Sequence, residues 1–173
     1  TENGYYAYVE ASGGGNPGKK AYLINDASFN LDIDYRLDFA YHMWSATAAE
    51  EVEIYGEVGG GNVSNGGQYN ETNDQSFNIY AISDYDTIEE VIDASLNWPT
   101  PFVTKIGTQG NQWNNESSPI DKDVRWIIFE AITSSDETRD VNGARTAWQS
   151  DIAIDYIRLH PTREYVKDIT ITT

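Results

Sequence analysis

Apolar and polar residues alternate with a period of two along most of this chain, which is the pattern of a strand with one buried face. The clearest run covers residues 35–44, where the odd positions from Tyr35 to Met43 are apolar and the even positions are mostly polar. Similar runs predict further strands at Tyr5–Ala11, Lys20–Ile24, Glu51–Val58, Phe77–Ile82, Phe102–Ile106, Val124–Thr133, Ile152–Leu159 and Val166–Thr172.

Turn and loop signals separate these runs. Residues 13–18 are rich in Gly and contain Pro, which predicts a turn, and residues 59–74 are rich in Gly and Asn, which predicts a mobile loop or an insertion. A single short helix is predicted near residues 86–93, with Asp86 as its N-cap. Together these elements predict an all-β fold: a jelly-roll β-sandwich of two antiparallel sheets, in one domain covering residues 1–173.

Charge narrows the range of partners. The 173 residues include 28 acidic and 11 basic side chains, so the formal net charge is −17 at pH 7. This charge repels nucleic acid and anionic membranes, because both need a basic surface, and it favours divalent cations or neutral, hydroxyl-rich ligands. A highly soluble, salt-adapted surface would explain the same charge without a specific partner.

Cysteine is absent, although extracellular modules of this size often carry disulfides. No apolar run approaches the ~18 residues that a membrane-spanning helix needs, and no signal peptide is visible. A cytosolic protein and a cysteine-free secreted bacterial protein both fit. The chain starts abruptly next to a predicted strand, so we expect a piece of a longer secreted or cell-surface protein.

Six short motifs follow one another in a fixed order and resemble a MAM domain. They are GYYAYVEAS (4–12), GKKAYL (18–23), LDFAYHM (37–43), GTQGNQW (107–113), WIIFE (126–130) and DIAIDYI (151–157). Any one of them is a weak signal, but six in the family's order over most of the chain are specific. The resemblance implies an extracellular jelly-roll module used for adhesion and recognition, and therefore a binding module with no catalytic role.

The chain departs from the family pattern in several places. The family's opening strand is absent or lies before Thr1, and the predicted strand Val166–Thr172 could fill the missing edge. Tyr156 replaces the second Asp of the family's D-D-I motif, and the loop between Gly59 and Asn97 is longer than usual. Cysteine-free versions are similar to modules in secreted bacterial proteins, beside peptidases, glycoside hydrolases and adhesins, so other domains of the same polypeptide are expected partners.

A structural calcium ion is one expectation. Jelly-roll modules often bind calcium between the first and last strands, where oxygen ligands lock both termini. The resemblance assigns Asp155 to this role, and Asp151 lies on the same strand face four residues earlier. An exposed aspartate pair on an acidic protein is the alternative, since calcium needs six or more oxygen ligands.

The acidic run Glu51–Glu57 is similar to the catalytic strand of laminarinase-type glycoside hydrolases, which also use a jelly roll. Retaining glycosidases need two carboxyls about 5–5.5 Å apart, and Glu51 and Glu53 lie on one face, about 6.6–7 Å apart by strand rise. The spacing to Glu57 does not fit, and a Glu replaces the central Asp. A solvated acidic face is therefore favoured over a hydrolase.

Aromatic side chains are the candidate ligand contacts, because exposed Trp and Tyr rings stack on sugar faces. Trp113 and Trp126 match family positions and are expected in the core, and His42 is expected to be structural. Other Trp residues fall in predicted loops, where they could bind a ligand or anchor the loop to the sandwich. The candidate ligand-binding residues are Trp44, Tyr55, Trp98 and Trp148.

Two functions remain open at this point. The first is binding of a neutral polysaccharide by a module attached to a polysaccharide-active enzyme or an adhesin. The second is protein–protein adhesion or a structural spacer, and a glycoside hydrolase is a third, weaker alternative. A jelly roll supports all of these functions, so the fold does not choose among them.

Overall fold

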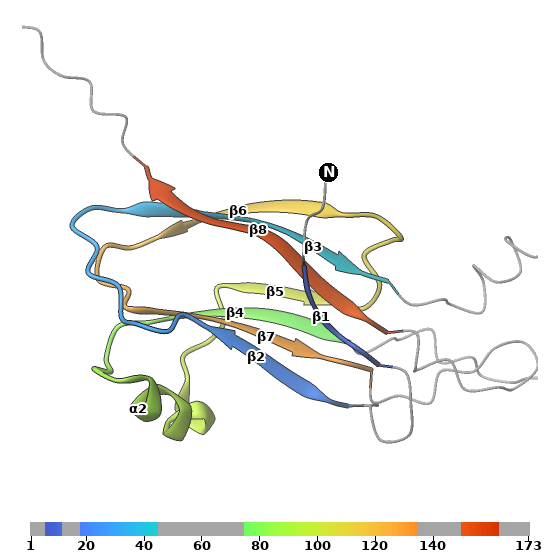
Figure 1. Cartoon of the computed structure of the whole chain (residues 1–173), viewed down its shortest axis with the longest axis horizontal. Helices are drawn as coiled ribbons and strands as arrows, with labels where there is room; N and C mark the ends of the chain where they lie inside the picture. The colour runs from blue at the N-terminus through green and yellow to red at the C-terminus, as the bar shows by residue number, and fades with distance from the viewer. Residues whose placement is uncertain (1–5, 12–17, 45–74, 135–149, 163–173) are drawn as a thin grey trace, which may run out of the picture.

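The computed structural model describes residues 6–11, 18–44, 75–134 and 150–162 (Figure 1). Their strands form two antiparallel four-stranded sheets that face each other, which confirms the predicted sandwich. Sheet A has the order β1-β8-β3-β6, and sheet B has the order β2-β7-β4-β5. Sheet A comprises β1 (Ala7–Val9), β8 (Ile152–Pro161), β3 (Tyr35–Met43) and β6 (Asn114–Ile120); sheet B comprises β2 (Lys20–Ile24), β7 (Trp126–Ile132), β4 (Ser76–Ile82) and β5 (Val103–Ile106).

The core lies between the sheets, where the predicted apolar face of β3 is buried. Phe39 contacts Phe77 of β4 and Phe129 of β7, with ring centroids 6.0 and 5.9 Å apart. Tyr41 stacks on Phe77 at 5.9 Å. Aromatic pairs contribute roughly 0.5–1.5 kcal/mol beyond their burial, so this group of rings fixes how the two sheets face each other. The even positions of β3 point to the outer face of sheet A.

A helical layer covers the outer face of sheet B. It consists of α2 (Ile88–Asp93) and a 3-10 turn (Ser95–Asn97). Val91 of α2 is fully buried and packs with Trp126 and Ile128 of β7, so β7 is covered on both faces. Trp126 is a core residue, as expected. Neither helical segment in the described residues has the length and apolar content that crossing a bilayer requires.

The predicted helix is confirmed, but the predicted N-cap is wrong. Thr87 caps α2, and its hydroxyl accepts from the Glu90 amide while the Glu90 carboxylate accepts from the Thr87 amide. Such a reciprocal pair satisfies two otherwise unpaired donors and is typically worth about 1 kcal/mol. Asp86 forms an ion pair with Arg125 instead.

Strand β6 is the main element that the alternation rule misses. Its residues, Asn114–Ile120, are mostly polar and include Pro119. The strand lies at the edge of sheet A, where one side needs no hydrogen-bonding partner and a proline is tolerated. The predicted strands Glu51–Val58 and Val166–Thr172 lie outside the described residues.

Candidate functional site

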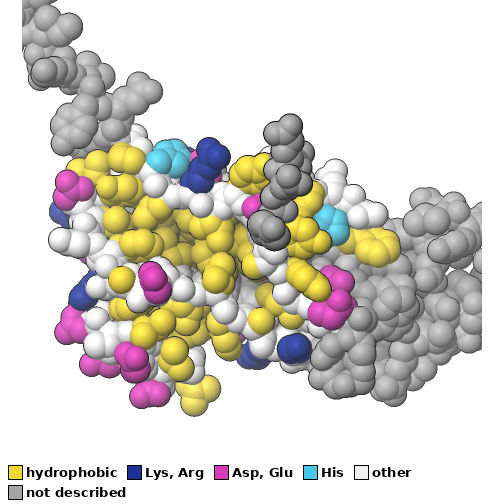
Figure 2. All heavy atoms as spheres, viewed as in Figure 1, with side chains coloured by type: hydrophobic (Ala, Val, Ile, Leu, Met, Phe, Trp, Pro, Cys, Tyr) yellow, Lys and Arg dark blue, Asp and Glu magenta, His cyan; other side chains and the backbone are white. Residues whose placement is uncertain are grey.

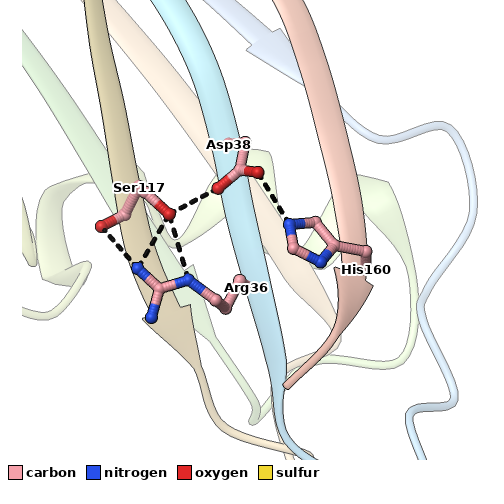
Figure 3. A network of polar contacts seen from close by, with 4 residues as sticks. All are labelled: Arg36, Asp38, Ser117 and His160. Carbon is pink, nitrogen blue, oxygen red and sulfur yellow. Dashed lines mark hydrogen bonds and ion pairs between the residues drawn. The ribbon is translucent and has the colours of Figure 1, made fainter. Parts of the chain in front are cut away.

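The outer face of sheet A carries a polar network that joins three strands (Figure 3). Asp38 of β3 accepts hydrogen bonds from the Ser117 hydroxyl of β6 and pairs with His160 of β8, whose Nε2 lies 2.7 Å from the Asp38 Oδ2. Arg36 donates to the Ser117 hydroxyl from Nε at 3.0 Å and from Nη2 at 2.8 Å. The hydrogen bond from Ser117, and then that from His160, lower the pKa of Asp38.

The order of the three groups argues against nucleophilic catalysis. In a hydrolytic triad the histidine lies between serine and carboxylate, so that it can take the hydroxyl proton. Here Asp38 lies between Ser117 and His160, and the serine proton points to a carboxylate with a lowered pKa, which is a weak base. The network fixes the orientation of hydrogen-bonding groups on the outer face of sheet A.

A β-bulge in β8 makes a hollow beside this network. Asp38 pairs with Arg158 and Ala40 with Asp155, so both Tyr156 and Ile157 lie opposite the single residue Phe39. Tyr156 has a φ of 55°, a left-handed conformation that tyrosine rarely adopts. The Asp155 carboxylate accepts a hydrogen bond from the Tyr156 amide at 2.7 Å and holds the bulge.

This hollow has a volume of about 480 Å³. Tyr156 is 49% exposed at its wall, and the Arg158 guanidinium lies 6.0 Å from the centre of its ring. Bulges re-aim side chains next to functional sites, and a left-handed non-glycine residue persists only where surrounding contacts hold it. The residues around the hollow combine aromatic rings with charged and hydrogen-bonding groups: Asp38, Phe39, Asn115, Glu116, Ser117, Tyr156 and Arg158.

An exposed aromatic cluster occupies the other end of the same face. Trp113 is 44% exposed and packs edge-on against Tyr6 at 5.7 Å; Tyr6 in turn lies 5.9 Å from Tyr8. The expectation that Trp113 belongs to the core is therefore wrong. His42 contacts Trp113 at 5.8 Å and bonds to the Asn111 side chain, in agreement with the structural role expected for it.

The turn before Trp113 explains its position. Gly107 and Gly110 have φ values of 74° and 86°, which favour glycine. The Gly107 amide donates to the Gln75 carbonyl and the Gln109 amide to the Met43 carbonyl, which ties the turn to the ends of β4 and β3. The tied turn carries Trp113 onto the outer face of sheet A, since β6 starts at the next residue.

The structure describes two of the four sequence-predicted ligand residues, Trp98 and Trp44. Trp98 is half-buried on the other sheet, where its Nε1 donates to the Val91 carbonyl at 2.8 Å and its ring contacts Tyr22 and Tyr80. Trp98 therefore anchors the helical layer. Trp44 directly follows β3 and is half-buried. Tyr55 and Trp148, with Glu51, Glu53 and Glu57 of the hydrolase alternative, lie outside the described residues.

The proposed calcium ligands are not brought together. Asp151 and Asp155 share the outer face but are four residues apart, about 13 Å along an extended strand, whereas both would need oxygen atoms 2.3–2.6 Å from one ion. The Asp151 Oδ1 accepts from the Ala11 amide at 2.7 Å, which links the chain after β1 to the start of β8. Burial, together with the charge of nearby Glu10, raises the pKa of Asp151.

A buried carboxylate lies on sheet B. Glu130 of β7 is 5% exposed and accepts hydrogen bonds from Tyr80 and Asn78, both at 2.9 Å. Burial, followed by the hydrogen bond to Glu130, raises the pKa of Tyr80 to about 12. Tyr80 also contacts the ring of Trp98 at 5.2 Å, which connects Glu130 to the residue that anchors the helical layer. Within the described residues, no group of three or more His, Asp or Glu side chains could hold a metal ion.

Two solved structures share the all-β sandwich fold of this chain. The cleaved adhesin domain K1 of Lys-gingipain from Porphyromonas gingivalis W83 is similar, with a TM-score of 0.52, 14% identity, and coverage of 91% of this chain and 73% of that chain. The cleaved adhesin domain K3 of the same protein is also similar, with a TM-score of 0.54 and 10% identity. That match covers 90% of this chain and 72% of the other chain. At these identities the likeness shows the fold. No protein-family model matches the sequence, and no curated protein matches it.

Proposed function

We propose that this chain is a non-catalytic adhesion module of a secreted or cell-surface protein, and that the outer face of sheet A binds a neutral polysaccharide. One observation carries the proposal: the exposed aromatic cluster and the hollow at the bulge lie on the same sheet face. Tyr6 precedes Ala7, which pairs with Ile154, so the cluster adjoins the strand segment that carries Tyr156.

The chemistry of this face suits a sugar polymer. Trp113 and Tyr156 offer ring faces for stacking, and the groups of the hollow offer donors and acceptors for hydroxyls. Residues of both signs line the hollow, with Asp38 and Glu116 beside Arg158, so the hollow lacks the basic surface that a sulfated or phosphorylated polymer needs. The net charge of −17 further disfavours anionic polymers.

Protein–protein adhesion is the second candidate, and the same cluster supports it. Exposed aromatic side chains are enriched in protein interfaces, and the two similar structures are adhesin domains by name. A protein partner would contact the aromatic cluster and would not need the hollow. The two candidate functions therefore differ in whether binding depends on the hydrogen-bonding groups near Tyr156.

The experiment is affinity electrophoresis and calorimetry of the chain with a panel of neutral and acidic plant and marine polysaccharides. Trp113→Ala and Asn115→Ala should each weaken binding of one neutral polymer about fivefold, since losing a stacked ring or a hydrogen bond costs roughly 1 kcal/mol. Tyr22→Ala, a partly exposed aromatic on sheet B, is the matched control and should bind normally. Binding of no polysaccharide, together with self-association or capture of a protein partner that depends on Trp113, would favour the second candidate.

A further inference from the structure

The outer face of sheet A is uneven, because two aromatic side chains from its opposite edges meet above its middle. Tyr6 precedes β1, the strand at one edge, and Trp113 precedes β6, the strand at the other edge. The two edges are about 14 Å apart, since neighbouring strands are spaced by about 4.8 Å, yet the ring centroids are 5.7 Å apart. Both side chains therefore reach inward over β8 and β3, and their rings form a ridge.

Two small residues lie in the middle of the same face. Ala40 of β3 and Ala153 of β8 point outward, since their neighbours along each strand belong to the core. They are only 4% and 8% exposed, although no described helix or strand packs on this face. Side chains of the face itself therefore cover them, and the ridge of Tyr6 and Trp113 extends over these two strands.

The rings along the ridge are not coplanar. The planes of Tyr6 and Trp113 make an angle of 72°, those of Tyr6 and Tyr8 an angle of 58°, and those of Trp113 and His42 an angle of 55°. A crystalline polysaccharide presents its sugar rings in one flat surface, so aromatic rings can stack on several of them only when the aromatic faces share a plane. The described rings fit successive sugars that are tilted relative to one another, as in a single bent chain.

The hollow adjoins the ridge along β6. Asn115, which lines the hollow, follows Trp113 by two residues, or about 7 Å along a strand. Figure 2 shows this face edge-on along the top, with hydrophobic side chains and a histidine at one end and a basic side chain beside the second histidine further along. The volume of about 480 Å³ lies in the range of small-ligand pockets, roughly 300–1,000 Å³. A short stretch of one chain could therefore lie in the hollow and continue over the ridge.

The charged groups of the hollow suit neighbouring hydroxyls of one sugar. The Asp38 carboxylate uses one oxygen with Ser117 and the other with His160, and an ionised carboxylate offers about four acceptor sites, so each oxygen can accept another hydrogen bond. The Arg158 guanidinium, 6.0 Å from the centre of the Tyr156 ring, supplies donors beside this acceptor. Such a donor and acceptor pair is recessed in the hollow, where a flat polymer surface does not reach.

We propose that the outer face of sheet A recognises single, bent chains of a soluble neutral polysaccharide, with one sugar in the hollow and the next sugars over the ridge, and that it does not bind flat crystalline polymer. This inference rests on the proposed function and narrows its class of ligand. It makes the contribution of each aromatic residue depend on the length of the bound chain.

Calorimetry with oligosaccharides of the bound neutral polymer tests this path. A trisaccharide should occupy the hollow, and a hexasaccharide should also cover the ridge and bind several-fold more tightly. Trp113→Ala should weaken the hexasaccharide about fivefold and leave the trisaccharide unchanged, which also shows that the variant is folded. Tyr156→Asn should weaken both, and Tyr22→Ala on sheet B should weaken neither. An equal loss for both lengths in Trp113→Ala, or no binding of either oligosaccharide by a chain that binds the polymer, would overturn the inference.

Sedimentation with insoluble polymers separates the two possible failures. The chain should stay in the supernatant with microcrystalline cellulose and with crystalline chitin, and yet bind at least one soluble neutral polysaccharide. Retention on either crystalline powder would overturn the inference while leaving the proposed polysaccharide binding in place. Binding to neither the soluble nor the crystalline polymers would instead overturn the proposed function.

Discussion

His160 and Asp38 lie 122 residues apart in the chain, yet the His160 Nε2 is 2.7 Å from the Asp38 Oδ2 on the outer face of sheet A. The pairing of β3 with β8 brings them together, because Arg36 is the direct partner of His160 and Asp38 that of Arg158. Asp38 is thus the carboxylate around which the polar network is arranged.

Asp38 should stabilise the fold in a pH-dependent way. Its folded pKa is lowered below the ordinary 3.8, so its contribution is present above that value and is lost as the pH falls through the folded pKa. The denaturation midpoints of the unmodified chain and Asp38→Asn should therefore differ at pH 6 and converge at pH 2. Asp26→Asn, at an exposed position away from the network, is the control and should show no such convergence.

The left-handed backbone at Tyr156 should lower the stability of the fold, while the side chain contributes to polysaccharide binding. A left-handed backbone costs a non-glycine residue about 1–2 kcal/mol, and Asn tolerates this conformation better than Tyr. Tyr156→Asn should therefore raise the free energy of unfolding by roughly 1 kcal/mol while weakening polysaccharide binding, as measured by denaturant unfolding and calorimetry. Tyr8→Asn replaces an exposed tyrosine in an ordinary strand and should not raise stability; a loss of stability in Tyr156→Asn would contradict the argument.

Alkaline pH should weaken the sheet B network. The pKa of Tyr80 is raised from 10.0 to about 12, so its contribution to stability is full below pH 10 and is lost as the pH rises from 10 to 12. The unmodified chain should therefore lose stability more steeply over this interval than Tyr80→Phe, which cannot ionise. Parallel pH profiles for the two proteins would show that Tyr80 does not interact with Glu130 in solution.

Trp98 should contribute to the stability of the fold and not to the affinity for a polysaccharide. Its Nε1 hydrogen bond to the Val91 carbonyl ties the chain after the 3-10 turn to α2. Trp98→Phe keeps a ring between Tyr22 and Tyr80 but removes this donor, so the free energy of unfolding should fall by about 1 kcal/mol. Polysaccharide affinity should stay unchanged, and a selective loss of affinity would restore Trp98 as a ligand residue.

Calcium should act through Asp151 and its neighbour Glu10. Burial and the Glu10 charge raise the pKa of Asp151, so its ionised form costs stability at neutral pH, and a cation would offset this cost. We expect calcium to raise the melting temperature of the unmodified chain relative to EDTA. Asp151→Asn keeps an acceptor for the Ala11 amide and should be more stable in EDTA but unresponsive to calcium; an unchanged response would place the ion elsewhere.

The alternation of apolar and polar residues is sufficient to predict a strand where one of its faces is buried and the other is solvated. The odd positions of β3 from Leu37 to Met43 are buried as predicted and Tyr35 is half-buried, since packing against β4 and β7 requires apolar residues there. β6 escaped prediction because an edge strand needs neither a full apolar face nor hydrogen bonds on both sides. The signal available for it was its place between the G-x-Q-G-x-x-W turn and the β7 strand.

The candidate site was less predictable, because it depends on register. Arg36 and Asp38 were assigned to one face of β3, but their partners Ser117 and His160 come from strands 79 and 122 residues away from Asp38. The hollow arises from a one-residue bulge opposite Phe39, which alternation within β8 does not reveal. The prediction that Trp113 lies in the core was wrong, because a tryptophan in such a motif can lie on the surface as well as in the core.

The helical layer over sheet B gives the sandwich a front and a back. α2 and Trp98 cover one broad face, while no described element covers the other, which carries aromatic rings and a hollow. Under the proposed function, a polymer would bind to the module from this one side. In a string of such modules, two copies would add avidity only if the linker let both bare faces reach the same polymer, so linker length would set binding strength as much as the face itself does.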